Sequence, residues 1–518
     1  MNGGIRMNHN ILELLEHSAA EYPDRPAFGD PTGDITFSEL EHSARMIGTF
    51  LTDHVSPCQP VAFYLEKSNL AMCGMMGAVY ARGFYCVLDT RQPDARTSKV
   101  LEVLHPAVIL TDAANRDKAE TFADAAAVYC IESLLENGSV DDRKLEAVRR
   151  TAVDTDPLYV NFTSGSTGIP KGVTVCHRSV IEFIEYFTSI FQITGQDILG
   201  NQAPFDFDVS VKDIYSGLMT GAKVQIIPRE YFSAPAQLMD YLADHQVTVL
   251  VWAVSAMCFV SIMNGLSYRV PQQVRMIMFS GEVMPVKHLR VWQKYLPDAV
   301  YVNLYGPTEI TCNCTYHILD HAFADTEVIP AGKAFPNEKV FLLDEQDHEV
   351  TEAGVDGEIC VCGTCLALGY YHDPERTAQA FMQNPLNPFY QEMMYRTGDI
   401  GRYDADGNLI YVSRKDFQIK HLGHRIELGE IENVAMSRDG VTRACCIYDT
   451  VKKRIILFCT GTREGADLMK ELRTVLPPFM IPNSIHPLEE MPLNKNGKID
   501  RKQLAEIYQS GQKPHHGV

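Results

Sequence analysis

Short apolar runs alternate with amphipathic stretches through roughly the first three hundred residues. Residues 180–191 and 236–246 repeat apolar side chains at the spacing of one helix face. Strands that alternate with helices predict a largely parallel sheet covered by helices, whose ligands gather where loops leave the carboxyl ends of strands. The runs expected as strands are residues 61–65, 107–110, 158–163, 223–227, 247–252, 275–280 and 300–305.

The pattern changes after about residue 330, where short alternating strands and turns predict an antiparallel, β-barrel-like subdomain over about 330–412. From Asp416 onward, a helical stretch, two apolar runs and a further helix predict a small α+β domain. We therefore expect an α/β plus α+β protein with a large domain over residues 1–415 and a small mobile domain over residues 416–518.

Composition narrows the class of protein. The chain has 518 residues, 46% of them hydrophobic and 22% charged, and no apolar run approaches the ~18 residues that a membrane helix needs. A net charge of −20 argues against nucleic acid as a partner, because phosphate backbones are bound by clustered Lys and Arg. The amino terminus resembles an amphipathic helix from Ile11 and not a signal peptide, so we expect a cytoplasmic protein and a monomer.

Fourteen cysteines in such a chain predict reduced thiols. The densest group is Cys360, Cys362 and Cys365, in a segment whose alternation predicts a half-buried strand. No histidine lies between them and no fourth ligand is evident, so we favour small core residues over a metal site. The same interpretation applies to Cys312 and Cys314.

Residues 163–172 read TSGSTGIPKG, directly after an apolar run. Glycines allow the backbone to approach a phosphate closely, while the hydroxyl groups and Lys171 supply donors and charge. Because Gly172 follows the lysine, where a Walker loop has Ser or Thr, this is a phosphate loop of another kind.

Three further segments carry polar side chains suited to a nucleotide. NLYGPTEIT (303–311) presents an amide, an aromatic ring, a hydroxyl and a carboxylate after an apolar run. YRTGDIGRY (395–403) places Asp399 at a turn where it can accept hydrogen bonds from ribose hydroxyls, and NKNGKIDRK (494–502) places Lys498 in a turn. Taken singly, each segment is equally compatible with an ordinary turn.

Together and in this order, these four segments resemble the acyl-adenylate-forming (ANL) superfamily, which includes adenylation domains of nonribosomal peptide synthetases, acyl-CoA synthetases and luciferases. Residues 205–215, 357–381 and 413–432 extend the resemblance over nearly the whole chain. It implies a ligase that uses ATP and Mg²⁺ to convert a carboxylic acid into an acyl-AMP, with release of pyrophosphate.

The resemblance implies roles for individual residues. Lys498, Thr308 and Glu309 would be catalytic, with Lys498 bridging the substrate carboxylate and the α-phosphate, Thr308 at the α-phosphate and Glu309 holding Mg²⁺. Asp399 would bind the ribose, with Arg414 nearby. The remaining ATP-binding residues would be Thr163, Ser164, Gly165, Ser166, Thr167, Gly168, Lys171, Asn303, Tyr305 and Gly306.

The family also implies a hinge at Asp416, about which the small domain swings between two poses. In one pose Lys498 completes the adenylation site. In the other, the segment with Gly423, His424 and Arg425 lines the tunnel for the attacking thiol.

The segment FDFDVSVKDIY (205–215) bears on the substrate. Asp208 fits the position at which amino-acid-activating members bind the substrate's α-ammonium. Asp206 is an alternative with a poorer match, and either carboxylate could instead cap a helix. The other residues implied to line the side-chain pocket are Val209, Lys212, Val251, Met278, Ser280, Leu304, Cys312 and Asn313.

Bulky Met278 and Leu304 predict a small substrate. The sequence pattern as a whole most resembles that of D-alanine:carrier-protein ligases. Those enzymes have a Cys where this chain has Ser280, so the sequence leaves the stereoisomer open, with serine and glycine as the next candidates. Lys212 is a second departure: its ammonium could point inward toward a polar or acidic substrate side chain, but we expect it to extend to solvent.

The chain ends about twenty residues after Lys498 without a carrier segment, so we expect the acyl group to pass to a phosphopantetheinyl carrier protein in trans. An acyl- or aryl-CoA synthetase with coenzyme A as acceptor is the alternative. A third hypothesis, a nucleotide-binding scaffold without activity, conflicts with the intact Lys171, Glu309, Asp399 and Lys498.

Overall fold

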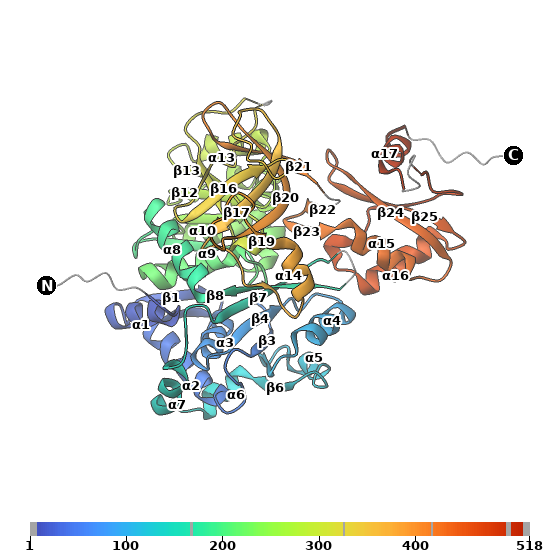
Figure 1. Cartoon of the computed structure of the whole chain (residues 1–518). Helices are drawn as coiled ribbons and strands as arrows, with labels where there is room; N and C mark the ends of the chain where they lie inside the picture. The colour runs from blue at the N-terminus through green and yellow to red at the C-terminus, as the bar shows by residue number, and fades with distance from the viewer. Residues whose placement is uncertain (1–7, 166–168, 325–326, 416–417, 494–498, 511–518) are drawn as a thin grey trace. The chain divides into compact units, whose positions relative to one another are not determined.

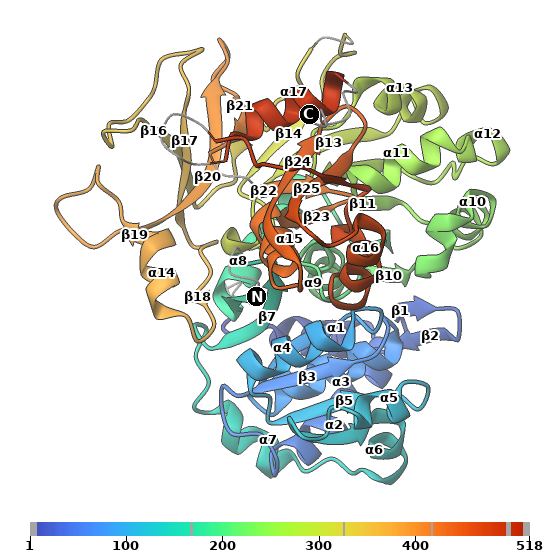
Figure 2. The same cartoon turned by 90° about the vertical axis from the view of Figure 1, so that its right-hand side faces the viewer.

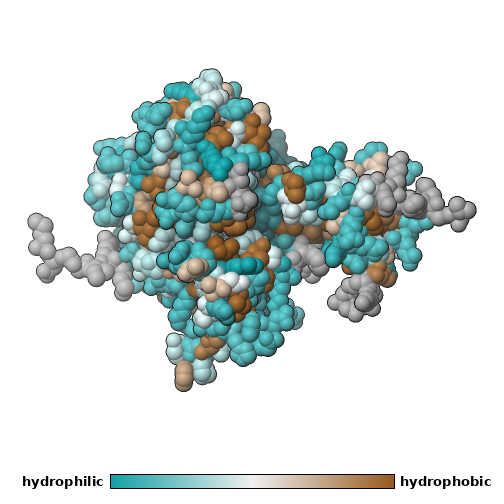
Figure 3. All heavy atoms as spheres, turned by 90° about the horizontal axis from the view of Figure 1, so that it is seen from above, coloured by the Kyte–Doolittle hydropathy of each residue, from teal (hydrophilic) through white to brown (hydrophobic). Residues whose placement is uncertain are grey.

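The computed structural model describes residues 8–165, 169–324, 327–415, 418–493 and 499–510. The chain divides into two compact units: a larger one made of residues 1–90, 104–161 and 172–415, and a smaller one made of residues 91–103, 162–171 and 416–518. In the ranges that the structure describes, no helix is long and apolar enough to cross a membrane. Figure 3 shows hydrophilic residues over most of the face seen from above, with small apolar patches between them.

Two large sheets contain most of the strands that the apolar runs predict (Figure 1). In the nine-stranded sheet, β1 and β9 to β13 pair in parallel, and β2, β14 and β15 add antiparallel edges. Its order is β15 (Lys333–Ala334), β14 (Thr315–Ile318), β13 (Val300–Tyr305), β12 (Met276–Ser280), β11 (Val249–Ala253), β9 (Ile198–Asn201), β10 (Lys223–Ile226), β1 (Pro26–Asp30) and β2 (Gly33–Thr36).

The seven-stranded sheet is also mainly parallel, since β7, β4, β3, β5 and β6 pair in that direction. Its order is β18 (Gly369–Tyr370), β8 (Lys171–Cys176), β7 (Pro157–Thr163), β4 (Phe84–Leu88), β3 (Pro60–Tyr64), β5 (Val108–Thr111) and β6 (Ala127–Cys130). The predicted helix-covered, mostly parallel sheets are therefore confirmed.

Apolar side chains on both faces bury the nine-stranded sheet. Along β11, Val249 and Val251 belong to one hydrophobic core, and Leu250 and Trp252 belong to a second core on the other face. Figure 2 shows α10 (Pro235–Asp244), α11 (Val254–Ile262) and α13 (Val286–Tyr295) on the side of β11 that the second core occupies. The first core is covered by α8 (His177–Ile190) and α9 (Val209–Thr220).

Local sequence sets where the helices begin and end. Helix α2 (Phe37–Leu51) starts with a capping box in which Thr36 and Glu39 satisfy each other's backbone N–H groups. Helix α9 ends at Gly221, whose positive φ of 71° suits glycine. The other α-helices are α1 (Leu12–Glu21), α3 (Asn69–Tyr80), α4 (Asp94–Leu104), α5 (Arg116–Glu120), α6 (Ile131–Asn137), α7 (Asp142–Arg149), α12 (Gly265–Tyr268), α14 (Pro374–Ala380), α15 (Leu428–Met436), α16 (Gly465–Val475) and α17 (Arg501–Ser510).

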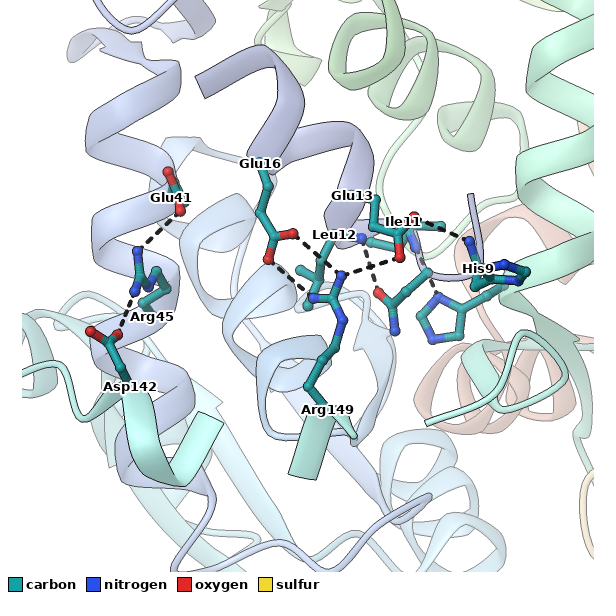
Figure 4. Close-up of polar contacts among 11 residues, drawn as sticks. His9, Ile11, Leu12, Glu13, Glu16, Glu41, Arg45, Asp142 and Arg149 are labelled. Atoms are coloured by element: carbon teal, nitrogen blue, oxygen red, sulfur yellow. Dashed lines mark hydrogen bonds and ion pairs between the residues drawn. The ribbon is translucent and has the colours of Figure 1, made fainter. Parts of the chain in front are cut away.

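Helix α1, predicted from Ile11, is fastened at both its start and its polar face (Figure 4). The N–H of Ile11 donates to Nδ1 of His177 at 3.3 Å. Arg149 bridges Glu16 at 3.1 Å and Glu13 at 3.7 Å. The first helix is thus tied to helices α7 and α8.

Residues 338–414 form the predicted antiparallel subdomain, a five-stranded sheet. Cys360 and Cys362 lie buried on β17, and Cys312, Cys314 and Cys365 are also buried. All five cysteines belong to hydrophobic cores, as predicted for small core residues. The strands are β16 (Glu338–Leu343), β17 (Gly357–Gly363), β20 (Met393–Tyr403), β19 (Phe381–Gln383) and β21 (Leu409–Arg414), which pairs with β20.

The smaller unit contains a hairpin and a three-stranded sheet packed on helices. Leu422 and Gly423 both have positive φ between the two hairpin strands, as a two-residue primed turn requires. Residues of α15, α16 and the sheet share one hydrophobic core. The strands are β22 (Gln418–His421), β23 (His424–Glu427), β24 (Val441–Asp449), β25 (Arg454–Gly461) and β26 (Ser484–Pro487).

Candidate active site

Three of the predicted nucleotide contacts meet in the larger unit. Asp399, on β20, is 1% exposed and accepts a hydrogen bond from the Tyr305 hydroxyl at 2.6 Å. Its other oxygen is paired with Nη1 of Arg414 at 2.7 Å, because β20 and β21 place Asp399 opposite Arg414. A carboxylate can accept about four hydrogen bonds, so these two donors orient Asp399 and leave capacity for hydroxyl groups.

Tyr305 and Asn303 lie near the end of β13, a strand of the nine-stranded sheet. Burial raises the pKa of the Tyr305 phenol well above its ordinary value, and the Asp399 carboxylate adds to that shift. The phenol therefore stays a hydrogen-bond donor. Asn303 donates from its amide to the carbonyl of Pro330 at 2.7 Å, which fixes the orientation of the amide.

The turn after β13 explains why Gly306 is needed. A Cβ at this position would lie 2.5 Å from the Cα of Asn313 and 2.9 Å from the carbonyl oxygen of Cys312. Such contacts are shorter than van der Waals separations, so only glycine lets the two backbone segments approach. Gly306 thereby brings the loop that carries Cys312 and Asn313 against the end of β13.

Thr308 and Glu309 begin a short 3-10 helix directly after this turn. Glu309 is 0% exposed, and its carboxylate accepts a hydrogen bond from the Tyr370 hydroxyl at 2.8 Å. Mg²⁺ in nucleotide enzymes is commonly held by one or two carboxylates together with phosphates and water. An oriented, buried carboxylate therefore fits the predicted role of Glu309.

The phosphate loop is described at its two ends, where Thr163 closes β7 and Lys171 opens β8. Within the smaller unit, the N–H of Gly165 donates to a carboxylate oxygen of Glu430 at 3.2 Å. Lys171 lies 3.3 Å from a carboxylate oxygen of Glu427.

The hydroxyl of Ser164 also takes part, since it donates to the Arg425 carbonyl at 2.7 Å and accepts from the N–H of Glu427 at 3.1 Å. The loop thus presents donors that hold oxygen anions, as a phosphate loop must. Ser166, Thr167 and Gly168 lie outside the described residues, as do Asp416 and Lys498.

The predicted thiol-tunnel residues lie on the β22–β23 hairpin. Gly423 occupies the turn with a φ of 82°, and the ring of His424 stacks on Phe479 with 3.7 Å between centroids. Arg425 donates from Nε to Gln418 at 2.5 Å across the hairpin. The hairpin is therefore held by side-chain contacts as well as by its backbone.

The residues predicted to line the side-chain pocket converge on one face of the nine-stranded sheet. Val251 pairs with Met278, and Met278 pairs with Val302. Because alternate residues of a strand share a face, Ser280 and Leu304 lie on this same face. Val251, Met278, Leu304 and Cys312 all belong to the core that α9 covers.

Asp208 immediately precedes α9 and is 6% exposed. Its side chain makes no capping hydrogen bond to the helix, so the capping interpretation is wrong. The backbone carbonyl of Asp208 accepts a contact from the Cys312 thiol at 3.1 Å, which ties the start of α9 to the loop after β13. For Asp206, the rival carboxylate, burial raises the pKa and Asp89 adds to the shift.

The expectation that Lys212 extends to solvent is wrong. Its side chain is 0% exposed, and Nζ donates to Oδ1 of Asn313 at 2.6 Å. Sequence reasoning failed here because an aliphatic stem can lead an ammonium either outward or along a helix face toward a buried acceptor. The alternative interpretation, an inward ammonium, is the one that the structure supports.

Sequence reasoning assigned no role to Tyr370, a residue that supports the site. Its hydroxyl donates to the Glu309 carboxylate, and its strand lies about sixty residues farther along the chain. Only spatial proximity reveals this residue, since it does not lie beside Glu309 in sequence.

Comparisons with known proteins show the family to which the chain belongs. The model of the AMP-binding enzyme family matches residues 15–371, and that of the AMP-binding enzyme C-terminal domain matches residues 430–498. Zwittermicin A synthase ZmaJ of Bacillus cereus is 31% identical over 96% of this chain and 95% of its own length. Tyrocidine synthase 1 of Brevibacillus parabrevis is 28% identical over 96% of this chain but only 45% of its own length.

Two solved structures share the fold. The Vibrio cholerae adenylation domain AlmE, in complex with glycyl-adenosine-5'-phosphate, has a TM-score of 0.83 at 22% identity, covering 98% of this chain and 99% of AlmE. Holo-PA1221, a nonribosomal peptide synthetase protein with adenylation and PCP domains, has a TM-score of 0.83 at 24% identity, covering 96% of this chain and 84% of PA1221.

The matching family models and the ZmaJ relative settle the class of reaction, which is activation of an acid by adenylation with ATP in an AMP-forming ligase. The paired Tyr305, Asp399 and Arg414 and the buried Glu309 lie within the segments that the sequence predicts for nucleotide binding. The chain therefore belongs to the AMP-binding enzyme family of the acyl-adenylate-forming superfamily and is similar to the adenylation domains of nonribosomal peptide synthetases.

Proposed function

We propose that the chain activates a small, alanine-like amino acid and transfers it to the phosphopantetheine thiol of a separate carrier protein. First, a carboxylate oxygen of the amino acid bonds to the α-phosphorus of ATP, and the bond from that phosphorus to the bridging oxygen breaks, releasing pyrophosphate. Next, the thiolate sulfur bonds to the acyl carbon while the bond to the AMP oxygen breaks. The thiol proton passes to water before the attack, and AMP leaves.

The observation that carries the amino-acid proposal is the buried Asp208 at the start of α9. A carboxylate at this position can form a charge-assisted hydrogen bond with the α-ammonium group of an amino acid, which is the role that the family resemblance implies for Asp208. The Cys312 contact to the Asp208 backbone sets this residue beside the loop that follows β13. A fatty acid or an aryl acid has no group that would need this anion.

The remaining roles are those that the family resemblance implies. Asp399, oriented by Tyr305 and Arg414, would accept hydrogen bonds from the ribose hydroxyls. Thr308 would donate to the α-phosphate. Mg²⁺ held by Glu309 would neutralise phosphate charge when bound. Lys498 would stabilise the negative charge that develops between the carboxylate and the α-phosphate, an effect typically worth ~2.7–4 kcal/mol in the barrier.

The structural neighbours support the choice of substrate and acceptor. AlmE was solved with an adenylate of glycine, a small amino acid, and PA1221 joins an adenylation domain to a PCP domain. A small amino acid also agrees with the bulky Met278 and Leu304 on the pocket face. The alternative, a CoA ligase, uses the same adenylation step and differs in the acceptor thiol.

Amino-acid-dependent exchange of labelled pyrophosphate into ATP tests the first half-reaction. We expect one small amino acid to stimulate exchange, and we expect Asp208→Asn to raise its KM at least about tenfold because a charge-assisted contact is lost. Asp206→Asn is the matched control and should leave that KM within about twofold. Exchange only with acids that lack an amino group would contradict the proposal.

The acceptor is tested by supplying either coenzyme A or the phosphopantetheine-loaded PCP domain of PA1221 to the preformed adenylate. We expect thioester to form on the carrier domain and not on coenzyme A. Efficient turnover with coenzyme A alone would favour the synthetase alternative.

A further inference from the structure

Lys212 is an unusual residue to find inside the pocket that the proposed function requires. It is among the largest fully buried side chains, and the described acceptor for its Nζ is the Oδ1 of Asn313, at 2.6 Å. An ammonium group removed from water costs several kcal/mol unless its donors are satisfied. Lys212 has three donors, and the hydrogen bond to Asn313 uses one of them.

The position of Lys212 is set by α9. Asp208 and Lys212 are four residues apart at the beginning of this helix, so they lie on the same side, with Cβ atoms about 6 Å apart. If the Asp208 carboxylate holds the α-ammonium of the substrate, Lys212 lies one helical turn away. That distance suits a substrate side chain that extends one or two bonds beyond Cβ.

The loop after β13 contacts both Asp208 and Lys212. Cys312 contacts the Asp208 carbonyl at 3.1 Å, and the next residue, Asn313, accepts the hydrogen bond from Lys212. Both loop residues are buried, and Cys312 has a positive φ of 75°. The ammonium is therefore held in a fixed place by a constrained loop, unlike a lysine that moves freely at the surface.

Tyr159, on β7, lies near the same loop as Lys212. Burial raises the pKa of its phenol well above the ordinary value, and Cys312 and Asp208 add to that shift. Burial lowers the pKa of Lys212, while Cys312, Asp208 and Asp213 oppose that shift. A ligand with an oxygen acceptor would pair with a donor of Lys212 that an aliphatic ligand cannot use.

We propose that Lys212 selects an amino acid whose short side chain ends in a hydrogen-bond acceptor oxygen, either a hydroxyl or a carboxylate. This inference rests on the proposed amino-acid activation and refines it. The bulky Met278 and Leu304 limit the length of the side chain, and Lys212 with Asn313 sets its polarity. 2-Aminobutyrate fills the same space as serine but offers the ammonium no acceptor, and binding sites built for a polar group discriminate strongly against analogues that lack it.

Pyrophosphate exchange with a matched set of amino acids tests the inference. The set comprises serine, aspartate, alanine and 2-aminobutyrate, in which a methyl group replaces the hydroxyl of serine. We expect the wild type to have a kcat/KM for serine or aspartate about 10- to 100-fold above that for 2-aminobutyrate, because a hydrogen bond to a charged group contributes on the order of 1.5–3 kcal/mol.

Three variants test whether the Lys212 ammonium causes the preference for serine or aspartate over 2-aminobutyrate. Lys212→Met keeps the length of the side chain and should reduce the preference to about twofold or less while leaving exchange with alanine measurable. Lys212→Gln keeps a neutral donor, so it should retain a preference for serine if the natural side chain is a hydroxyl and lose it if that side chain is a carboxylate. Lys287→Met, on the exposed face of α13, is the control and should behave like the wild type.

The outcomes separate this inference from the function on which it rests. Exchange that is highest with alanine or 2-aminobutyrate, or a serine or aspartate preference that Lys212→Met leaves intact, would overturn the role of Lys212 and leave amino-acid activation standing. Exchange with no amino acid at all would overturn both. Thermal denaturation of Lys212→Met and Lys212→Gln shows whether a loss of exchange activity comes from unfolding.

Discussion

At the scale of single residues, Asp399 depends on two donors that come from distant parts of the chain. Tyr305 lies ninety-four residues away and donates at 2.6 Å, and Arg414 donates at 2.7 Å from the neighbouring strand. Because both donors bind the same carboxylate, removing one of them should change the orientation of the Asp399 carboxylate without leaving it unpaired.

We therefore expect Tyr305→Phe to raise the KM for ATP in pyrophosphate exchange by about 3- to 20-fold, since one hydrogen bond to a charged group is lost and the ring is kept. The KM for the amino acid should stay within about twofold. Tyr403→Phe is a suitable control, because Tyr403 lies on the same strand as Asp399, four residues farther along, and its hydroxyl donates at 3.4 Å to the carbonyl of Val340. An unchanged KM for ATP in Tyr305→Phe would argue against nucleotide binding at Asp399.

Sequence motifs identify residue types well and side-chain directions poorly. Tyr305, Asp399 and Arg414 were each predicted as nucleotide contacts, and the structure brings them together. The direction of Lys212 could not be predicted, because it depends on an acceptor, Asn313, that is one hundred and one residues away in sequence. The support that Tyr370 gives to Glu309 was missed for the same reason.

At the scale of elements, the start of α1 depends on the protonation of one buried histidine. Nδ1 of His177 accepts the hydrogen bond from Ile11, so this nitrogen must carry no proton. Burial lowers the pKa of His177 from 6.5 to about 3, Asp156 opposes the shift and Arg149 adds to it. Below pH 6.5 His177 binds a proton in the unfolded chain, whereas in the folded chain it stays neutral until the pH approaches 3. The contribution of this histidine to the free energy of unfolding is therefore complete above pH 6.5 and is lost as the pH falls toward 3.

We expect the apparent melting temperature of the wild type to fall between pH 7 and pH 5 more steeply than that of His177→Asn, which keeps an acceptor but does not titrate. The free-energy slope for one such group is at most about 1.4 kcal/mol per pH unit, which corresponds to on the order of 2 °C per pH unit. His42→Asn, on the exposed side of α2, is the control and should follow the wild type. Parallel pH profiles for the wild type and His177→Asn would contradict this account.

Element types followed closely from the spacing of apolar residues, but strand order did not. The runs at 223–227 and 247–252 became β10 and β11 as expected, yet β9 lies between them in the sheet and β10 pairs with β1 from the amino terminus. Periodicity reports which face of a strand is buried. It carries no information about which distant strand supplies the neighbouring hydrogen bonds.

At the scale of the whole molecule, the last boundary between the two compact units along the chain falls between Lys415 and Asp416. The family resemblance predicts a hinge there, and we propose that rotation at Asp416 separates the adenylation pose from the thiol-transfer pose. A proline at this position would fix its φ near −65° and restrict Lys415 as well, so the chain could no longer take two different backbone conformations at the hinge.

We expect Asp416→Pro to slow thioester formation on the carrier by roughly tenfold or more while pyrophosphate exchange falls by less than about threefold, because many rates in two-pose enzymes are set by such a rotation. Asp416→Asn leaves the backbone free to rotate and should support both half-reactions. The measurement compares amino-acid-dependent exchange with loading of the PA1221 PCP domain for each variant. Equal losses in the two half-reactions of Asp416→Pro would show that this position serves the fold or the adenylation step and not a rotation between them.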